Sequence, residues 1–227
     1  MCEKCNDTEY LITIDDDGYV YAKQCECGVK KDFERRLRRS GLLDLFQEFR
    51  FENYQVKGKW QEIIKHKALD YVENGVKNGE WFFIGGQVGA GKTMICTAIV
   101  GKLIELGYEA HYMQFRQEIM ELKMGMEDFA EHHRKLNYLK TVKVLYIDDL
   151  FKGSKIPTEA DVRLVFDLLN YRYNNKSLIT LISTEKNIQD IISIDEAIGS
   201  RIYQKSREYM INLAQNKELN QRLKKEN

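Results

Sequence analysis

The sequence is poor in proline and has no surplus of charge of either sign. Its 227 residues include one proline, and 35 lysines and arginines balance 35 aspartates and glutamates. A net charge of zero gives no general argument for binding nucleic acid. No apolar run is long enough to cross a bilayer, and the opening residues, MCEKCNDTEY, lack the apolar stretch of a signal peptide. We therefore expect a cytoplasmic protein that contacts no membrane and whose thiols stay reduced.

Cysteine is also scarce, but four of the five cysteines lie within the first 27 residues. Reduced thiols grouped in this way favour metal binding over disulfides. The two pairs have the spacings C-x2-C and C-x-C, and each pair can offer two thiolates to a tetrahedral zinc ion. The predicted zinc ligands are Cys2, Cys5, Cys25 and Cys27. Cys96, by contrast, follows a glycine-rich loop among apolar residues and is expected in the core.

Residues 10–24, between the two pairs, alternate apolar and polar side chains around an Asp17-Gly18 turn, which is typical of a β-hairpin. Two cysteine pairs that flank a hairpin predict a zinc ribbon, with Gly28 in a turn of positive φ after the second pair. So short a segment buries little apolar surface, and the metal would therefore organise its fold. The alternative is four free cysteines in an unfolded tail.

A basic stretch follows the cysteines. Residues 30–39 hold six basic and two acidic residues, and two apolar residues at helical spacing predict a helix that ends near Gly41. The charged face of this helix either contacts DNA or a partner, or is simply solvated. We assign residues 1–40 to a zinc-ribbon module with its basic helix, and residues 45–227 to a second domain.

Glycine is concentrated in the stretch GGQVGAGKT at residues 85–93. An apolar strand precedes it, and an amphipathic helix that ends at Gly107 follows it. The spacing G-x4-G-K-T between strand and helix is the Walker A pattern, in which backbone N–H groups and the helix N-terminus bind phosphate. We expect Lys92 to reach the β- and γ-phosphates and Thr93 to bind Mg²⁺. The loop residues predicted to contact the nucleotide are Gly86, Gln87, Val88, Gly89, Ala90, Gly91, Lys92 and Thr93.

An acidic pair ends the apolar run VLYIDDL at residues 144–150. This is the Walker B arrangement, in which Asp148 holds Mg²⁺ through water and Asp149 polarises the attacking water. A helix that Thr158 caps follows, and then a buried strand that ends at Thr184. Alternating strands and helices predict an α/β fold with a parallel sheet between helices. Ligands bind such sheets beyond the carboxyl ends of the strands.

Five stretches, GGQVGAGKT, VLYIDDL, VFDLLNYRY, LISTEKN and AIGSRIY, together resemble the DnaC/DnaI-type replicative helicase loaders between residues 45 and 225. These loaders are a branch of the AAA+ ATPases that is also similar to the IstB transposition ATPases. The cysteine-rich N-terminus and the short chain resemble the small loaders carried by phages of Gram-positive bacteria. The resemblance implies a P-loop AAA+ ATPase with a five-stranded parallel sheet, slow hydrolysis of ATP with Mg²⁺, and self-association into an AAA+ oligomer.

The resemblance also implies a task and its partners. The task is to load a hexameric DnaB-type helicase onto single-stranded DNA during replication initiation, in the bacterial cytoplasm or, for a phage protein, that of the host. One alternative is an IstB-like transposition regulator that acts on duplex DNA; another is a nucleotide-dependent helicase-binding module with negligible hydrolysis. The cysteine module favours the loader because an adaptor needs a partner, and the neutral charge disfavours strong binding to a duplex.

Further residue roles are implied by the same resemblance. Ser183 or Thr184 would be the sensor 1 residue that contacts the γ-phosphate, and the following Glu185 leaves the choice between them open. Arg201, in the stretch GSRI, would be an arginine finger that acts on ATP held by a neighbouring subunit. Arg222, in the stretch NQRLK, would be the sensor 2 residue.

The resemblance places single-stranded DNA along residues 116–141. The basic residues there are Arg116, Lys123, Arg134, Lys135 and Lys140. Tyr138 is the aromatic residue close to these charges that can stack on a base. His132 and His133 are either metal ligands or solvated helix residues, and the lack of a nearby carboxylate pattern favours the second interpretation.

Overall fold

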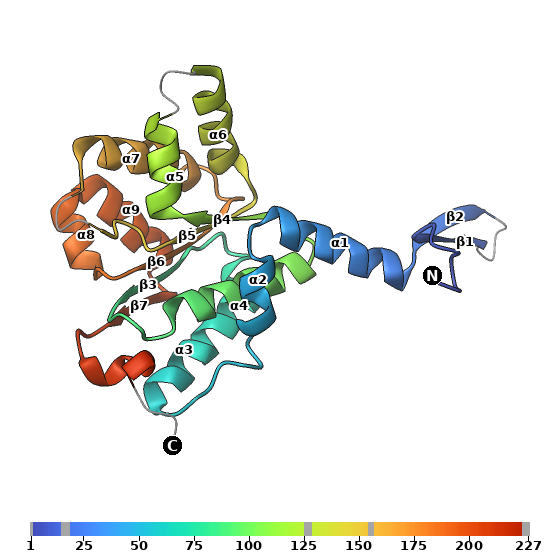
Figure 1. Cartoon of the computed structure of the whole chain (residues 1–227), viewed down its shortest axis with the longest axis horizontal. Coiled ribbons are helices and arrows are strands. Elements are labelled where there is room, and N and C mark those ends of the chain that lie inside the picture. The colour runs from blue at the N-terminus through green and yellow to red at the C-terminus, as the bar shows by residue number, and fades with distance from the viewer. Residues whose placement is uncertain (1, 15–18, 125–128, 154–156, 224–227) are drawn as a thin grey trace.

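The structure is a computed structural model that describes residues 2–14, 19–124, 129–153 and 157–223. Figure 1 shows an α/β body from which a helical arm projects, with a small hairpin at the tip of the arm. The body is built around one sheet, and the arm is the N-terminal end of the chain. The Asp17-Gly18 turn predicted for the hairpin lies outside the described residues.

A five-stranded parallel sheet forms the centre of the body, as predicted, with the strand order β4-β5-β6-β3-β7. Its strands are β3 (Phe82–Gly86), β4 (Ala110–Gln114), β5 (Val144–Asp148), β6 (Ile179–Thr184) and β7 (Met210–Leu213). Strands β3, β5 and β6 are buried along their whole length because helices cover both faces of the sheet.

One face of the sheet is covered by the N-terminal helices and the other by the helices that follow β4 (Figure 1). Alternate strand residues enter the two cores, so that Phe82 packs on the first and Phe83 on the second. The first face carries α2 (Leu43–Glu48), α3 (Lys59–Asp70), the π-helical turn η1 (Tyr71–Gly75) and α4 (Lys92–Glu105). The second carries α5 (Phe115–Met124), α6 (Phe129–Thr141), α7 (Glu159–Tyr173), α8 (Ile188–Ile194) and α9 (Glu196–Ser206).

Local signals in the sequence explain where the predicted helices begin and end. Thr158 caps α7 through a reciprocal pair of hydrogen bonds with Asp161. Helix α4 begins after Gly91, whose φ is +80°, and stops before Gly107, whose φ is +94°. Within the described residues, no helix is both long and apolar enough to cross a membrane.

Arg172 of α7 is a charged side chain that the core buries completely. Its guanidinium donates to one hydroxyl and four backbone carbonyls, those of Thr180 and of Leu139, Lys140, Val142 and Ile179. Burial lowers the pKa of Arg172 to about 9, which leaves it a cation at neutral pH. This side chain therefore satisfies the carbonyls at the end of α6 and joins that helix to the start of β6.

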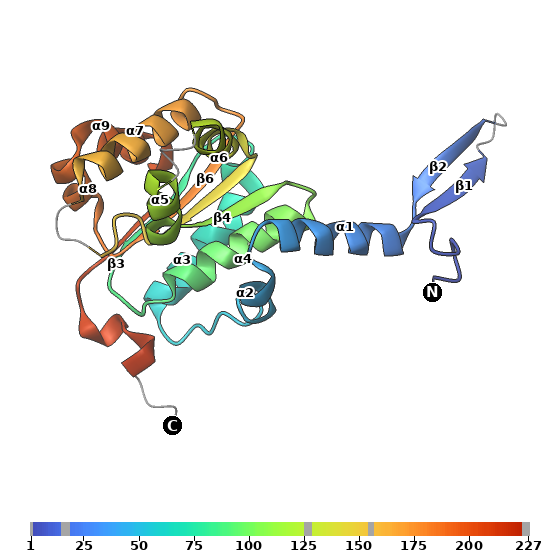
Figure 2. The ribbon, with the colours of Figure 1, turned by 45° about the horizontal axis from the view of Figure 1, so that its top comes forward.

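The arm consists of an antiparallel hairpin and one long helix (Figure 2). Its elements are β1 (Tyr10–Ile14), β2 (Val20–Gln24) and α1 (Glu26–Arg39). The hairpin confirms the prediction for residues 10–24. The turn predicted at Gly28 is wrong, because Gly28 lies inside α1, where an added Cβ would be 2.6 Å from the Glu9 carbonyl oxygen. Glycine is needed there for close packing of the helix on the first cysteine loop.

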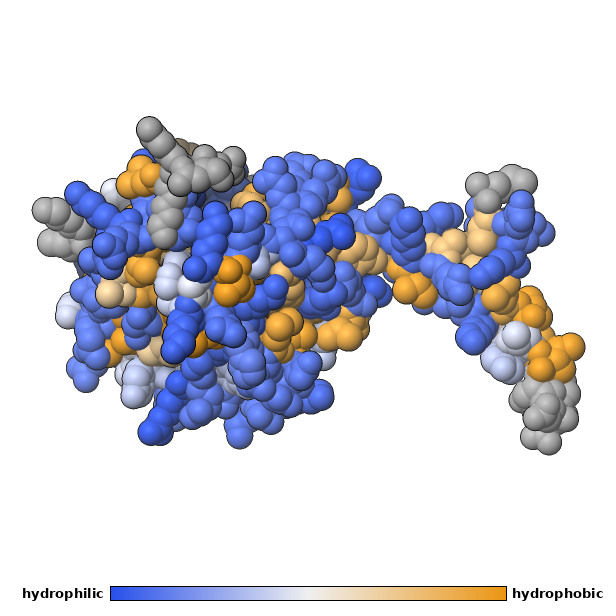
Figure 3. Space-filling model, turned by 90° about the horizontal axis from the view of Figure 1, so that it is seen from below, coloured by the Kyte–Doolittle hydropathy of each residue, from blue (hydrophilic) through white to orange (hydrophobic). Residues whose placement is uncertain are grey.

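The outer face of the hairpin is apolar and exposed. Ile12, Ile14 and Val20 are 71%, 68% and 67% exposed, and Figure 3 shows apolar side chains gathered at the tip of the arm. A two-stranded sheet without a covering layer has little stability of its own.

The base of the arm is anchored on the body. Leu37 is buried in the core, and Phe33 packs edge-on against Phe46 of α2 with ring centroids 5.6 Å apart. The Tyr112 N–H of β4 donates to the Ser40 carbonyl at 2.8 Å. Helix α1 therefore belongs partly to each region, and the division of the chain at residues 1–40 and 45–227 stays a prediction.

Candidate functional site

The glycine-rich loop connects β3 to α4 at the carboxyl end of the sheet. Two of its glycines have positive φ and no room for a side chain. A Cβ on Gly86 (φ +109°) would lie 2.0 Å from the Leu213 carbonyl oxygen, and one on Gly89 (φ +72°) would lie 2.0 Å from Asn220. The Gln221 N–H donates to the Gly89 carbonyl at 2.9 Å. The segment after β7, with the short 3-10 turns η3 (Lys217–Leu219) and η4 (Gln221–Leu223), thus supports the loop from outside.

Lys92 lies at the first position of α4 and is almost fully buried. Its Nζ donates to the carbonyls of Gly86 at 2.8 Å and Gln87 at 2.7 Å, so the amine is held inside the loop. Burial lowers the pKa of Lys92. A buried amine amid backbone N–H groups at a helix N-terminus makes this loop an anion site.

The loop borders a cleft of about 860 Å³. Several residues between 48 and 57, among them Tyr54, also line it, together with Gln61 of α3. Gly86 and Gln87, both predicted to contact the nucleotide, do not border this cleft, whereas Val88 to Thr93 do. The cleft is large enough for a nucleotide, because ligand pockets of this kind measure roughly 300–1,000 Å³.

Asp148, the last residue of β5, accepts hydrogen bonds from four hydroxyl groups. Oδ1 accepts from Thr93 at 3.2 Å, from Tyr146 at 2.7 Å and from Ser183, and Oδ2 accepts from Tyr112 at 2.8 Å. Burial raises the pKa of both tyrosines, so their hydroxyls stay protonated and donate. Thr93 and Asp148 bring oxygen ligands together beside the phosphate loop, which fits Mg²⁺.

Asp149 begins the loop after β5 and has a left-handed backbone, with φ +59°. The turn is closed by the Lys152 N–H, which donates to the Asp149 carbonyl at 2.9 Å. Lys152 Nζ lies 2.7 Å from Asp149 Oδ2 and 3.1 Å from Glu185 Oε1. The hydrogen bond with Asp149 raises the pKa of Lys152. One oxygen of Asp149 is therefore engaged by a cation of its own chain.

The two candidate sensor 1 residues end β6 and point to different partners. Ser183 donates to Asp148 and accepts from the Asp149 N–H at 3.2 Å. The Thr184 hydroxyl donates to the Leu150 carbonyl at 2.7 Å and accepts from the Lys186 N–H. Both side chains are fully buried. Ser183 thus contacts the acidic pair directly, and Thr184 fixes the loop that follows it.

The two candidate arginines lie in different places. Arg222 borders the nucleotide cleft, as a sensor 2 residue would. Arg201 is on α9, where it donates to Asn170 and to the Ala197 carbonyl and stacks on the ring of Phe166 at 5.1 Å. It does not border the cleft of its own chain.

Most of the basic residues considered for DNA contact form ion pairs. Lys123 pairs with Asp161, Arg134 with Glu131, Lys135 with Glu121, and Lys140 with Asp167. Arg116 instead lines a second cleft of about 820 Å³ between α2 and α5, which also reaches Asp148. Tyr138 packs edge-on against His111 at 5.3 Å. Of this set, Arg116 has the best access to a ligand.

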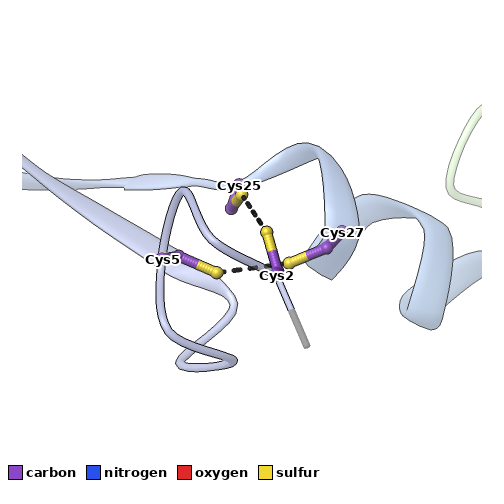
Figure 4. A group of neighbouring side chains, drawn as sticks. All are labelled: Cys2, Cys5, Cys25 and Cys27. Atoms are coloured by element: carbon purple, nitrogen blue, oxygen red, sulfur yellow. Dashed lines mark hydrogen bonds between the residues drawn. The ribbon is translucent and has the colours of Figure 1, made fainter.

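The four N-terminal cysteines point toward one centre (Figure 4). Their sulfur atoms all lie within 4.8 Å of one another, with 3.8 Å between Cys2 and Cys25 and 3.3 Å between Cys5 and Cys27. Tetrahedral zinc requires sulfur atoms roughly 3.8 Å apart, which follows from a Zn–S bond of about 2.3 Å. A hydrogen bond from Cys27 and the backbone N–H groups of Lys4 and Cys5 lower the pKa of Cys2 to about 7.

This grouping agrees with the predicted ligand set, while bound zinc stays a prediction. Cys25 caps α1 and Cys27 lies in its first turn, so the second pair is presented by a helix start. Across the described ranges, no other group of three or more His, Cys, Asp or Glu side chains is close enough to share an ion. His132 Nδ1 lies 2.9 Å from the Leu122 carbonyl, and His133 contacts Asn137. Cys96 is fully buried, as predicted.

Sequence reasoning missed several residues of the site. Tyr146 was detectable, because it lies two residues before Asp148 on the same strand face. Tyr112 and Gln221 come from β4 and from the segment after β7, and no motif marks either of them. Lys152 is three residues beyond Asp149, but only the left-handed turn brings its amine back to that carboxylate.

Comparison with known proteins agrees with this geometry. The profile of the family described as "IstB-like ATP binding protein" matches residues 22–205. The chain is 37% identical over 204 residues to the uncharacterized protein YqaM of Bacillus subtilis, a match that covers 85% of this chain and 63% of YqaM. The chain therefore spans less than two thirds of the length of that relative.

Two other relatives carry informative names. The phage-like element PBSX protein XkdC of Bacillus subtilis is 32% identical over 223 residues, which cover 92% of this chain and 81% of XkdC. The replicative helicase loader DnaC of Escherichia coli is 25% identical over 175 residues, which cover 77% of this chain and 69% of DnaC. Among solved structures, a crystal structure of the DnaC helicase loader has a TM-score of 0.62 at 21% identity and covers 76% of this chain and 99% of its own. At 21% identity, this structural similarity shows a shared fold and no more.

Proposed function

The chain belongs to the family of IstB-like ATP binding proteins, and from this premise we propose that it is an ATP-dependent loader of a hexameric replicative helicase onto single-stranded DNA. The observation that carries the proposal is the meeting of Lys92, Thr93 and Asp148 at the carboxyl end of the sheet. The names of XkdC and DnaC support the choice of a phage-type helicase loader within the family.

ATP is the proposed substrate, with its phosphates in the loop of residues 86–91. The Lys92 amine would exchange the carbonyls of Gly86 and Gln87 for oxygens of the β- and γ-phosphates. The N–H groups at the start of α4 favour the negative charge there. The nucleoside end would then lie against the residues between 48 and 57 that line the cleft.

Magnesium would be held by Thr93 directly and by Asp148 through water. When bound, the ion neutralises charge that develops on the transferred phosphoryl group. The chain contributes the orientation of both oxygen ligands, which the hydroxyl contacts of Asp148 fix before any ligand enters. This pre-organisation reduces the free-energy cost of assembling the site.

Asp149 is the proposed base for the attacking water. One of its oxygens is engaged by Lys152, so we expect hydrolysis to be slow while that ion pair holds. Arg201, which lies outside its own cleft, would act on ATP bound by a neighbouring subunit of an oligomer. Ser183 touches the acidic pair, and Arg222 borders the cleft; they are the proposed sensor 1 and sensor 2 residues.

The arm is the proposed helicase-binding element, organised by zinc on Cys2, Cys5, Cys25 and Cys27. Its exposed apolar face, with Ile12, Ile14 and Val20, suits a partner protein better than solvent. Single-stranded DNA is proposed to contact the body at the cleft that Arg116 lines.

Retention of a helicase with and without ATP tests this function. The replicative helicase of Bacillus subtilis, the organism of two relatives, would be immobilised and exposed to three proteins: the unaltered chain, Lys92→Ala and Ile12→Asp. We expect the unaltered chain to be retained and then to transfer the helicase to circular single-stranded DNA in an ATP-dependent way. Lys92→Ala should be retained without transfer, and Ile12→Asp should not be retained.

The control is Ile63→Asp, an isoleucine on α3 that is also well exposed and is far from the arm in sequence. It should behave like the unaltered chain. Absence of helicase retention by the unaltered chain under every nucleotide condition would contradict the loader function. Preferential binding of duplex DNA would point instead to a transposition regulator.

A further inference from the structure

Tyr112 connects the edge strand of the sheet with the carboxylate proposed to hold magnesium. It lies in the middle of β4, directly opposite Tyr146 of β5 in the parallel register. The two rings are 5.4 Å apart, and both hydroxyls donate to Asp148. A pair of tyrosines on neighbouring strands thus reaches one carboxylate.

The two oxygens of Asp148 are held unequally. Oδ1 accepts from Thr93, Tyr146 and Ser183. Among the described residues, Oδ2 accepts from Tyr112 alone, at 2.8 Å. A carboxylate pinned at one oxygen can still rotate about that contact, so the Tyr112 bond defines the plane of the group.

Tyr112 also differs from the donors Tyr146 and Ser183 in its access to ligands. Tyr146 and Ser183 are sealed in the core, whereas Tyr112 lines both the nucleotide cleft and the second cleft. Asp148 therefore meets the clefts on the side where Thr93 and Tyr112 lie. Thr93 and Asp148, the residues that would hold an ion, therefore border the same cleft as Tyr112.

We propose that Tyr112 is a positioning residue for magnesium, whose hydroxyl orients the Asp148 carboxylate so that it and Thr93 serve one ion. This inference rests on the proposed nucleotide function of the site. Groups that hydrogen-bond a metal-binding side chain fix its orientation, and their loss weakens metal affinity by roughly 10- to 100-fold. The proposed role belongs to the hydroxyl alone. The ring packs near Gly41 and the Tyr112 N–H donates to the Ser40 carbonyl, and a variant that lacks only the hydroxyl keeps both contacts.

Tyr112→Phe removes this hydroxyl and keeps the ring. The matched control is Tyr209→Phe, because the Tyr209 hydroxyl donates to Asp70 at 2.7 Å, the same type of bond outside the nucleotide site. For each full-length protein, binding of a fluorescent ATP analogue is measured in excess EDTA and then titrated with Mg²⁺. Thermal unfolding of the same samples reports any general loss of stability.

Binding of the analogue is expected to change as Mg²⁺ is added. We expect Tyr112→Phe to raise the Mg²⁺ concentration at half of that change by about tenfold. Its affinity for the analogue in EDTA should stay within about twofold of the unaltered chain, since Lys92 and the loop are intact. Tyr209→Phe should leave the Mg²⁺ requirement unchanged, even with a similar fall in melting temperature.

An unchanged Mg²⁺ requirement in Tyr112→Phe, with a magnesium response in the unaltered chain, would overturn this inference alone. If Tyr112→Phe weakens binding of the analogue equally with and without Mg²⁺, as a merely structural role predicts, this inference is also overturned. An unaltered chain that binds no nucleotide, or whose binding ignores Mg²⁺, would overturn the proposed function and this inference with it.

Discussion

Asp148 in the nucleotide site is surrounded by side chains that the core holds in place, whereas the cysteines of the arm flank a hairpin whose apolar face meets solvent. Tyr146 and Ser183 are fully buried and fix the carboxylate. Among the described residues, none covers the apolar face of the hairpin, where Ile12, Ile14 and Val20 are exposed. The phosphate site therefore exists before its ligand arrives, while we expect the cysteine site to need an ion for its stability.

Two equally clear sequence motifs can therefore depend on different stabilising interactions: the core of the body for one, and a bound ion for the other. The large core of the body positions the glycine loop and the acidic pair, so mutations in that core should change the geometry of the site. The cysteine motif is local, and its loss should leave the body intact.

Removal of zinc is expected to have the largest effect, and it should be confined to the arm. Structural zinc in small modules contributes apparent binding free energies of about 10–16 kcal/mol. We expect about one zinc per chain, and Cys25→Ser or a chelator should expose residues 1–25 to protease while ATP affinity is retained. Metal analysis of reduced, freshly purified protein with no zinc would contradict this account of the arm.

Arg201→Ala should reduce ATP hydrolysis by roughly 10³-fold, because a finger supplied by a neighbour stabilises charge in the transition state. Nucleotide affinity and zinc content should stay the same, because the change affects the rate of hydrolysis and neither the binding of nucleotide nor the structure of the arm. Steady-state phosphate release measures the effect. Lys205→Ala on the same helix is the control, because Arg201 and Lys205 both lie over the ring of Tyr173.

Mixing Arg201→Ala with Lys92→Ala protein tests whether the arginine acts across subunits. The mixture should recover part of the activity, since some interfaces pair an intact pocket with an intact finger. A mixture that stays inactive although the two variants co-assemble would show that Arg201 does not act in this way.

Arg172→Met should destabilise the body by roughly 3 kcal/mol, because it leaves several buried carbonyls without a donor. We expect a fall of about 10 °C in the main melting transition, and weaker nucleotide binding only as that transition is approached. Arg163→Met is the control on the same helix, since its exposed pair with Glu159 contributes little. Equal melting temperatures for the two variants would show that the buried guanidinium does not support the core.

Ile12→Asp should have the smallest effect on stability, within about 0.5 kcal/mol, because the side chain is exposed in the hairpin. Chemical unfolding of the whole chain measures it. Leu37→Asp is the contrast, because Leu37 is buried where the arm joins the body. A large loss of stability in Ile12→Asp would mean that the apolar hairpin face is covered within the chain rather than offered to a partner.

Much of the body was predictable from local pattern. Strands with a continuous apolar run, such as Phe82–Gly86 and Ile179–Thr184, and helices that a glycine bounds at each end, such as Lys92–Glu105, follow directly from sequence. Strands β4 and β7 did not, because their short runs owe their strand conformation to pairing with β5 and β3.

The site shows the same division. The spacing of the two motifs was enough to predict Lys92, Thr93 and the acidic pair, because the loop and the end of the strand fix where these residues lie. Tyr112 has no motif, since its role arises from the register between β4 and β5. Gly28 misled the prediction because a glycine needed for close packing looks, in sequence, like a glycine needed for a turn.

Binding and hydrolysis of ATP by Asp149→Asn, measured on the same samples, test the central claim that this cleft is an ATPase site with Asp149 as its base. Asp148 and Thr93 are untouched by this change, so the account predicts an ATP–Mg²⁺ affinity within about twofold of the unaltered chain. Hydrolysis should fall by about 100-fold or more, the usual contribution of a positioned base. Equal loss of binding and hydrolysis, or undiminished hydrolysis, would contradict the account.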